Sequence, residues 1–586
     1  MKSIFYSSHN LFKSVAFFAL VSCSTTQNPV SSIPKNLQPR EVQDRKFSKF
    51  VASTQNPESS RIAREIFEKS GNLVDAAVAA SFAISVERPQ STGIGGGGFF
   101  VYFDAKANKT YAVDFRERAP LRAKEKMYLD AKGEIIPDLS LEGGLAAATP
   151  GLVKGLWEIH QKFGKLPWNE IVEPSILLAE KGFPVYPHLA AFFKMQAEVL
   201  KKFPASKSLF FKNQNETLVV GDLLKQPGLG KTLREIAKLG PKGFYSGWVA
   251  RELIEASSAS GGILSQSDLD SYRVRWLEPL RIKAGNYELV TMPPPSSALH
   301  VLQAFYLAEK TFESPLDYQS KKHFLEFGKI FQRVFADRAE FLGDGEFYKV
   351  PVQGLISKGY LDEIQNSLKV SEYKKSEFVK AGSLSQLQDE SVETTHMSFM
   401  DSFGNAVSTT QSVNGPLGAG VVAGKAGFLL NNTMDDFSVK PGVPNMYGAI
   451  GGAANAIMPK KTPLSSMSPT LVFETLGQET KPVMAVGAPG GTRIITCTAQ
   501  TLVNFLLFKR DLYSSVNDIR LHHQWLPDVL IIEKPGPRSE ILSKLEKTGL
   551  AVKIDDIPCR VMATTLEGKQ LHGVTDPRDG GIVEGL

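Results

Sequence analysis

The sequence changes character at Thr394, and this change limits the folds open to the chain. Between about residues 190 and 370, apolar residues mostly recur at helical spacing. After Thr394 they gather in short segments separated by glycine and proline, which is typical of strands. These segments are HMSFMD, NAVSTTQSV, GFLLNN, SPTLVFE and PVMAVGAPGG, followed by an apolar helical stretch, RIITCTAQTLVNFLLF. This order predicts an α+β fold in which stacked sheets are flanked by helices.

The earlier part of the chain adds a few clear elements. Apolar spacing predicts helices over 60–89, 149–164 and 324–344. A hairpin is predicted over 98–120, and a strand pair near 278–292. Residues 371–393 are charged and weakly periodic, which indicates a surface segment or linker.

Composition excludes several classes of function. The chain has 586 residues, 42% of them hydrophobic, and a net charge of only +6. It has no dense basic block with interleaved aromatics, so nucleic-acid binding is not expected. Neither C-x-x-C nor H-E-x-x-H occurs, so zinc and thioredoxin-like sites are disfavoured and no cofactor is indicated. Cys497 and Cys559 are expected to be small buried hydrophobes rather than a disulfide.

The N-terminus reads as an export signal. Lys2 and Lys13 precede an apolar run that is too short to span a bilayer, which needs about 20 residues. The run ends in LVSC, which resembles a bacterial lipobox with Cys23 as the lipidated residue. We expect a signal peptide at 1–22 and a flexible polar tether at 23–47. A plain signal peptide that is cut nearby is the alternative.

Two short motif matches are contradicted by the sequence around them. GIGGGG at 93–98 fits G-x-G-x-x-G, but a helix precedes it and a strand follows, which is the reverse of a dinucleotide site. We expect a tight glycine turn there. SEYK, SVN and KTG match the penicillin-binding signature in order. However, Ser371 lies in a lysine-rich polar run rather than at the start of a buried helix, so a penicillin-binding-type serine enzyme is disfavoured.

Thr394 and Thr395 stand where the polar run ends and the strands begin. A threonine hydroxyl becomes a useful nucleophile when its own α-amine is the base, and this requires the threonine to be a chain N-terminus. An α-amine has a pKa of about 7.7–8.0, so part of it is neutral near pH 7. The local pattern alone also allows that the two threonines only start a strand.

Longer motifs add a resemblance that covers nearly the whole chain after about residue 50. The motifs, in order, are GNLVDAAVAASFAISVERPQSTGIGGGGFFVYFD, VDFRERAP, AATPGLVKGLW, ETTHMSFMDSFGNAVSTTQSVNGPLGAG, GFLLNNTMDDFSVKPGVPNMYG, PLSSMSPTLVF, GAPGGTRIIT and RLHHQWLPD. With these motifs the chain closely resembles the γ-glutamyltranspeptidase (glutathione hydrolase) family of the N-terminal nucleophile (Ntn) hydrolase superfamily.

The resemblance implies an αββα sandwich and a precursor that cuts itself between Glu393 and Thr394. Residues 48–393 would form a large subunit and 394–586 a small subunit, and the two would stay together as a heterodimer. Thr394 would then be the nucleophile, with its α-amine as base and Thr395 in support. The implied reaction cleaves γ-glutamyl amide bonds of glutathione and related compounds. It passes the γ-glutamyl group to water or to amino acid or dipeptide acceptors.

The resemblance also implies the binding residues, through their places in the motifs. Arg116, Ser465 and Ser466 would hold the donor α-carboxylate, and Asp436 and Asn414 the α-ammonium. The other positions are Gly490 and Gly491 for the oxyanion, Ser412 near the nucleophile where relatives often have Thr, Tyr447 on a lid loop, and Thr433. Relatives commonly have Gln or Glu at position 433, reaching the α-ammonium, and Thr433 is too short for that contact.

Three alternatives stay open on the sequence. Two are related Ntn enzymes, a cephalosporin acylase and a poly-γ-glutamate depolymerase. The third is an inactive binding protein of the cell envelope. The expected location is the bacterial envelope, as a periplasmic or outer-membrane lipoprotein that touches the membrane only through its lipid anchor.

Overall fold

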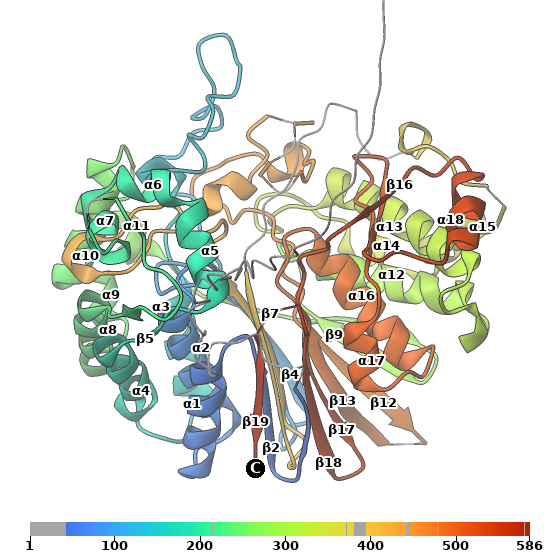
Figure 1. Cartoon of the computed structure of the whole chain (residues 1–586), viewed down its shortest axis with the longest axis horizontal. Helices are drawn as coiled ribbons and strands as arrows, with labels where there is room; N and C mark the ends of the chain where they lie inside the picture. The colour runs from blue at the N-terminus through green and yellow to red at the C-terminus, as the bar shows by residue number, and fades with distance from the viewer. Residues whose placement is uncertain are drawn as a thin grey trace, which may run out of the picture.

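The computed structural model describes residues 43–213, 215–370, 372–379, 394–440, 442–443, 445–446, 448–477, 479–578 and 580–586. Two large sheets lie face to face between two layers of helices (Figure 1). The predicted four-layer αββα sandwich is therefore confirmed. The predicted signal peptide, Cys23 and most of the predicted tether fall outside the described residues. The end of that tether is not flexible as predicted, because Asp44–Phe47 form a strand that pairs with residues 571–574.

Each sheet contains strands from both sides of Thr394. All neighbouring strands within each sheet are antiparallel. The first sheet runs in the order β19 (Ile582–Gly585), β2 (Phe50–Thr54), β10 (Thr395–Asp401), β11 (Ala406–Ser412), β3 (Gly97–Asp104), β4 (Lys109–Asp114) and β7 (Arg275–Leu277). The second runs in the order β1 (Asp44–Phe47), β18 (Gln570–Thr575), β17 (Met562–Glu567), β13 (Glu479–Gly487), β12 (Thr470–Leu476), β9 (Tyr287–Thr291) and β8 (Leu280–Ala284).

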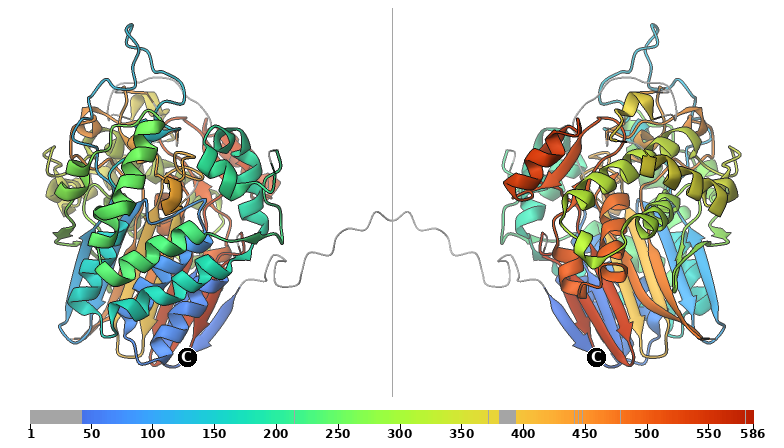
Figure 2. Two further views of the ribbon diagram at one scale, coloured as in Figure 1. Left: turned by 90° about the vertical axis from the view of Figure 1, so that its left-hand side faces the viewer. Right: turned by 90° about the vertical axis from the view of Figure 1, so that its right-hand side faces the viewer.

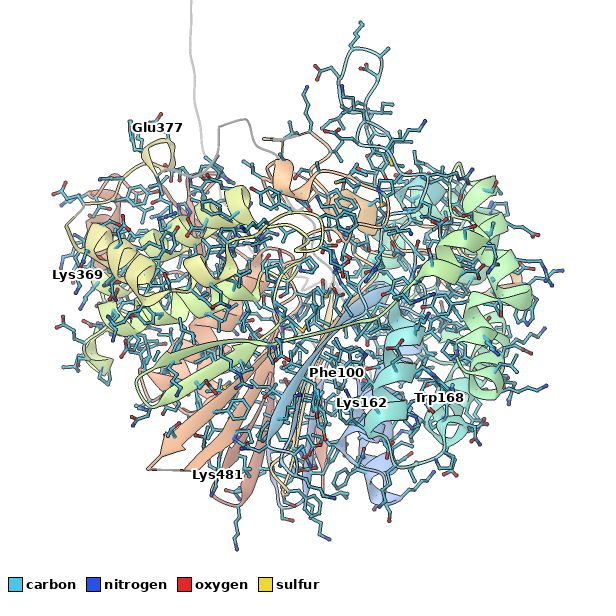
Figure 3. All side chains as sticks on the ribbon, turned by 180° about the vertical axis from the view of Figure 1, so that it is seen from behind. Phe100, Lys162, Trp168, Lys369, Glu377 and Lys481 are labelled. Atoms are coloured by element: carbon cyan, nitrogen blue, oxygen red, sulfur yellow. A yellow bond between two sulfur atoms is a disulfide. The ribbon has the colours of Figure 1, made fainter. Side chains whose placement is uncertain are left out.

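The apolar cores follow the layers. A core of Val101, Met400, Leu471 and similar side chains fills the space between the two sheets. A second core joins the first sheet to the helices of the N-terminal part, and Figure 3 shows Phe100 and Trp168 on the two sides of that contact. A third core joins the second sheet to the remaining helices.

The helices divide between the two outer faces (Figure 2). One layer holds α1 (Pro57–Glu68), α2 (Leu73–Glu87), α3 (Leu152–Phe163), α4 (Trp168–Lys181), α5 (Pro187–Met195), α6 (Ala197–Lys201), α7 (Pro204–Phe210), α8 (Pro227–Leu239), α9 (Lys242–Tyr245), α10 (Gly247–Ala259) and α11 (Gln266–Ser271). The other holds α12 (Ala298–Thr311), α13 (Lys321–Phe341), α14 (Val352–Leu355), α15 (Lys358–Val370), α16 (Arg493–Leu506), α17 (Leu512–Asn517) and α18 (Ser539–Glu546). Two minor sheets complete the fold, β5 (Phe183–Pro184) with β6 (Leu223–Leu224), and β14 (Leu521–His522) with β15 (Leu530–Glu533) and β16 (Val552–Asp555).

The helix predicted over 60–89 is two helices. The first helix ends at Glu68, and Gly71 stands in the break, where a Cβ would lie 2.6 Å from the Ile66 carbonyl oxygen. Asn72 then caps α2 through a capping box with Asp75. Every residue of α2 is buried, which explains its apolar character on all sides.

Two further predictions need correction. GFLLNN is not a strand; its Leu429 makes only an isolated bridge to Val422. Cys497 and Cys559 form a disulfide, contrary to the expectation of two separate thiols. The fold brings α16 and the segment before β17 together, so their Cα atoms lie 6.7 Å apart, within bonding range. Sequence spacing of 62 residues gave no sign of this contact.

The segment 371–393 was predicted to be exposed, yet part of it is anchored. Ser376 is buried, and its backbone N–H donates to Asp528 Oδ2 at 3.0 Å. Its hydroxyl donates to the Trp525 carbonyl oxygen at 2.5 Å. Figure 3 shows Glu377 at the end of the molecule opposite Lys481, which lies in β13 close to its turn with β12.

Among the described residues, the helices are too short or too polar to cross a membrane. The same part of the chain contains no cluster of three or more His, Cys, Asp or Glu side chains suited to a metal ion.

Candidate active site

Thr394 lies directly before β10, a central strand of the first sheet. Thr394 is buried, with 5% of its surface exposed. The start of β10 pairs with β11 through Thr395 and Gln411, and the pairing with β2 begins further along, at Ser398. Behind it, Thr395 Oγ1 lies 2.9 Å from Ser91 Oγ, which also accepts from Arg88 Nε at 3.1 Å.

A small cavity opens at Thr394. Its other lining residues are Arg116, Arg338, Ser412, Asn414, Asp436, Asn445, Ala449, Leu464, Ser465, Ser466, Met467, Gly491 and Ile494. Arg116 and Arg338 precede the 393–394 junction, and the rest follow it. The structure thus gathers eight of the predicted site residues. Gly490 and Thr433 do not line the cavity. Cys23, Glu393 and Tyr447 lie outside the described residues.

Arg116 enters the cavity from the end of β4. Its guanidinium makes an ion pair with Asp436, and its Nε donates to the Pro463 carbonyl oxygen at 3.1 Å. Burial raises the pKa of Asp436, while the charges of Arg116 and Arg338 oppose this rise. In the cavity as it stands, the cation and the anion satisfy each other.

A buried ion cluster fixes the two loops that meet here. Arg275 Nε donates to Asp114 Oδ2 at 2.8 Å, and its Nη1 donates to Asp344 Oδ1 at 2.7 Å. Asp114 Oδ1 accepts the Arg116 backbone N–H, and Asp344 Oδ2 accepts that of Thr462, each at 2.8 Å. The cluster therefore sets the position of Arg116 relative to the loop that carries the two serines.

Arg338 is a site residue that sequence reasoning missed. It projects from α13, and its Nε and Nη2 donate to Ser297 Oγ at 2.9 Å and Ser466 Oγ at 3.2 Å. A guanidinium can only donate, so the Ser466 hydroxyl hydrogen remains available to an acceptor in the cavity. Burial lowers the pKa of Arg338 to about 10, which leaves it charged at neutral pH. The sequence did contain a signal for this role, because Arg338 lies on the apolar face of the helix predicted over 324–344.

Asn445 was missed as well. Its side chain lines the cavity, and its Nδ2 lies 3.4 Å from Asp436 Oδ1. Asn414, on the other side, has a left-handed backbone with φ of 75°. Its N–H donates to Ser412 Oγ at 2.8 Å, and its Nδ2 donates to the Asn432 carbonyl oxygen at 3.1 Å. These bonds hold the turn after β11 against the cavity.

Thr433 was predicted to lie at the donor site, but it does not face the cavity. Its side chain is fully buried, and its hydroxyl donates to Glu117 Oε1 at 2.8 Å. Glu117 Oε2 lies 3.8 Å from Arg116 Nη1 and has no hydrogen-bond partner among the described residues. Because Thr433 is short, it reaches the carboxyl behind Arg116 rather than the space in front of it.

Gly490 and Gly491 form the turn between β13 and α16. Their φ values of 142° and 55° suit glycine. A Cβ on Gly490 would lie 2.8 Å from Cys559 Cβ, so the disulfide packs against this turn. Gly491 lines the cavity just before the N-terminus of α16, where backbone N–H groups favour negative charge.

Comparisons with known proteins show the family of this chain. The model of the family described as gamma-glutamyltranspeptidase matches residues 59–586. The glutathione hydrolase proenzyme of Escherichia coli (strain K12) is 39% identical over 89% of this chain and 89% of its own. The glutathione hydrolase proenzyme of Pseudomonas aeruginosa is also 39% identical, over 89% of this chain and 92% of its own.

Solved structures show the same fold. Cephalosporin acylase from Bacillus halodurans superposes with a TM-score of 0.79 over 94% of this chain and 98% of its own. At 24% identity this likeness concerns the fold alone. Helicobacter pylori gamma-glutamyltranspeptidase is 37% identical, with a TM-score of 0.54 over 56% of this chain and 93% of the compared chain.

The buried carboxyl behind Arg116 gives a pH test. Burial raises the pKa of Glu117 from 4.5 to about 7. Its contribution to stability is therefore full below pH 4.5 and is lost as pH rises through 7. Relative to Glu117→Gln, the wild type should lose about 2–3 kcal/mol of unfolding free energy between pH 5 and 8. Urea unfolding at both pH values measures this, with both proteins carrying Thr394→Ala so that each unfolds as one chain, and parallel pH curves for the two proteins would contradict it.

Proposed function

Because the chain belongs to the γ-glutamyltranspeptidase family, we propose that it is a self-processing γ-glutamyltransferase and glutathione hydrolase. The supporting observation is the place of Thr394, at the start of a central strand and in a cavity walled by both parts of the chain. The enzyme is an Ntn hydrolase. Its donors are glutathione and other γ-glutamyl compounds, and its acceptors are water, amino acids or dipeptides.

Processing comes first in this proposal. Thr394 Oγ attacks the Glu393 carbonyl carbon, the peptide C–N bond breaks, and an ester replaces the amide. Water then hydrolyses the ester and releases the Glu393 carboxylate. The products are a large subunit that ends at Glu393 and a small subunit, 394–586, with a free α-amine on Thr394.

Turnover uses that new amine. It takes the Thr394 hydroxyl proton as Oγ attacks the γ-carbonyl carbon of the donor. Backbone N–H groups of Gly490 and Gly491, beside the α16 N-terminus, stabilise the tetrahedral oxyanion. The leaving amine departs with the proton from the α-ammonium. Water or the amine of an acceptor then attacks the γ-glutamyl ester and restores Thr394.

Donor recognition in this proposal exchanges one ion pair for two. The donor head group is a zwitterion, so its carboxylate can meet Arg116 while its ammonium meets Asp436. Ser466 donates to the same carboxylate, because Arg338 already occupies its oxygen as a donor. Both buried charges remain paired throughout, which avoids the cost of isolating either one.

The first prediction concerns processing. Thr394→Ala should remain one chain without γ-glutamyl hydrolase activity, because both the nucleophile and the cut are lost. Thr394→Ser keeps a hydroxyl and should still be cut, so it serves as the matched control. Intact mass and N-terminal sequencing measure the result. A small subunit that starts at any residue other than Thr394 would exclude the proposed site.

A second prediction concerns the donor carboxylate. Arg116→Ala should lower kcat/KM for a γ-glutamyl anilide by roughly 30-fold or more, since truncating one member of a buried charge pair costs about 2–5 kcal/mol. The 4-aminobutyryl anilide lacks only the α-carboxylate and should lose little further activity in the variant. Equal losses for both anilides would show that Arg116 does not bind this group.

We also propose an envelope location. The disulfide between Cys497 and Cys559 suits an oxidising compartment. The LVSC sequence supports a lipid anchor at Cys23, on a polar tether. Wild-type protein should fractionate with membranes and Cys23→Ser should not. Identical fractionation and signal processing in the two would leave a soluble exported enzyme instead.

A further inference from the structure

The segment RLHHQWLPD, residues 520–528, has no role in the proposed chemistry, yet it is largely buried near the cavity. His522 and His523 are buried, and Trp525 has a left-handed φ of 71°. A chain does not hold a bulky residue in this conformation without support from its surroundings. Gln524, at the bend, is half-buried and bonds in two directions.

One of these hydrogen bonds leads to the oxyanion turn, which is the Gly490–Gly491 turn between β13 and α16. Thr492, next to Gly491, donates its hydroxyl to Gln524 Oε1 at 2.7 Å. His522 Nε2 lies 2.8 Å from the same oxygen. An amide oxygen only accepts, so both partners donate, and His522 is assigned the tautomer with hydrogen on Nε2. Burial keeps the pKa of His522 well below its usual value, which agrees with a neutral ring.

The other direction leads to the turn that carries Asn445. Gln524 Nε2 donates to the Gly448 carbonyl oxygen at 3.1 Å. The Gly448 N–H donates to the Asn445 carbonyl oxygen at 2.9 Å and closes this turn. Asn445 in turn lines the cavity beside Asp436. Through this turn, Gln524 reaches the end of the cavity that would take the donor amino-acid group.

We propose that Gln524 is a positioning residue that couples the two ends of the donor site. Its amide oxygen holds the oxyanion turn through Thr492, and its amide nitrogen holds the Asn445–Gly448 turn. This inference rests on the proposed function, because the two ends are named by the γ-glutamyl group that they would bind. It accounts for the glutamine at this position, since an amide side chain accepts through its oxygen and donates through its nitrogen.

The expected effect falls on the transition state. Oxyanion donors act because they are already in place when charge develops, and a displacement of about 1 Å can cost roughly 100-fold in rate. Gln524→Met keeps the length of the side chain but loses both bonds. Gln524→Glu keeps the acceptor for Thr492 and loses the donor to Gly448. The two variants therefore separate the two couplings.

A matched control lies in the same neighbourhood. Gln500, on α16, is also a buried amide, and it bonds the backbone N–H and C=O of Leu521 at 2.8 and 2.7 Å. It contacts neither turn through these bonds. Gln500→Met therefore reproduces the loss of a buried amide without the proposed coupling.

The experiment compares kcat and KM for a γ-glutamyl anilide with the affinities of two ligands. One ligand is glutamate, and the other is its γ-boronic acid analogue, which forms a tetrahedral adduct with a hydroxyl nucleophile. Gln524→Met should lower kcat about 10- to 100-fold and weaken the boronate at least 10-fold more than glutamate. Gln524→Glu should mainly raise KM. Gln500→Met should melt at a lower temperature with the boronate-to-glutamate ratio unchanged.

A second variant and a separate activity measurement keep the proposal testable if one variant fails to fold. If Gln524→Met does not fold, Thr492→Val removes the same bond from the other side and should share the loss of kcat with little change in KM. A ratio that is unchanged in Gln524→Met, or equal to that of Gln500→Met, overturns the inference. Wild-type turnover that Thr394→Ala abolishes tests the proposed function separately, so the two failures are distinguishable.

Discussion

Strand pairing across the Glu393–Thr394 junction is the constraint on which the rest of the structure depends. β10 and β11 lie between β2 and β3, which come from the other part of the chain. In the second sheet, β13 and β12 likewise lie between earlier strands at both edges. Neither part can complete a sheet alone, so each would leave unpaired strand edges. Thr394 is positioned by the strand that follows it, which pairs with β11 from Thr395 onward and with β2 from Ser398 onward.

The cavity rests on this frame through buried charges. The Arg275 cluster joins the end of β4 to the loop before Ser465, so Arg116 arrives opposite Asp436. A buried cluster of this kind costs solvation and is strongly destabilised when one partner is lost. In this protein the cluster determines the shape of the cavity, because it fixes the relative positions of two loops that are far apart in sequence. Arg338 adds a similar constraint from the helical layer.

Much of this could be predicted from the sequence, and the failures have physical causes. The layers, the hairpin at 98–120 and the helix after Gly491 follow from periodicity and motifs. The break at Gly71 was missed because apolar spacing continues across it. The disulfide and Arg338 were missed because both depend on contacts between distant segments. Thr433 shows the limit of transfer by motif, since a shorter side chain finds a different partner, Glu117. Gln524 was quoted within a motif, but only the folded chain shows that its amide bonds two separate turns.

The position of the disulfide affects whether the protein could reassemble after cleavage. Cys497 and Cys559 both follow Thr394, so the bond staples only the later part of the chain to itself. If the junction is cut as proposed, this disulfide does not join the two products. The precursor would fold as one molecule, whereas the cut protein would have to reassemble from two, at a rate that depends on concentration. Such a cleavage would make assembly a one-way event, and the cut protein would persist because it unfolds slowly rather than because it refolds easily.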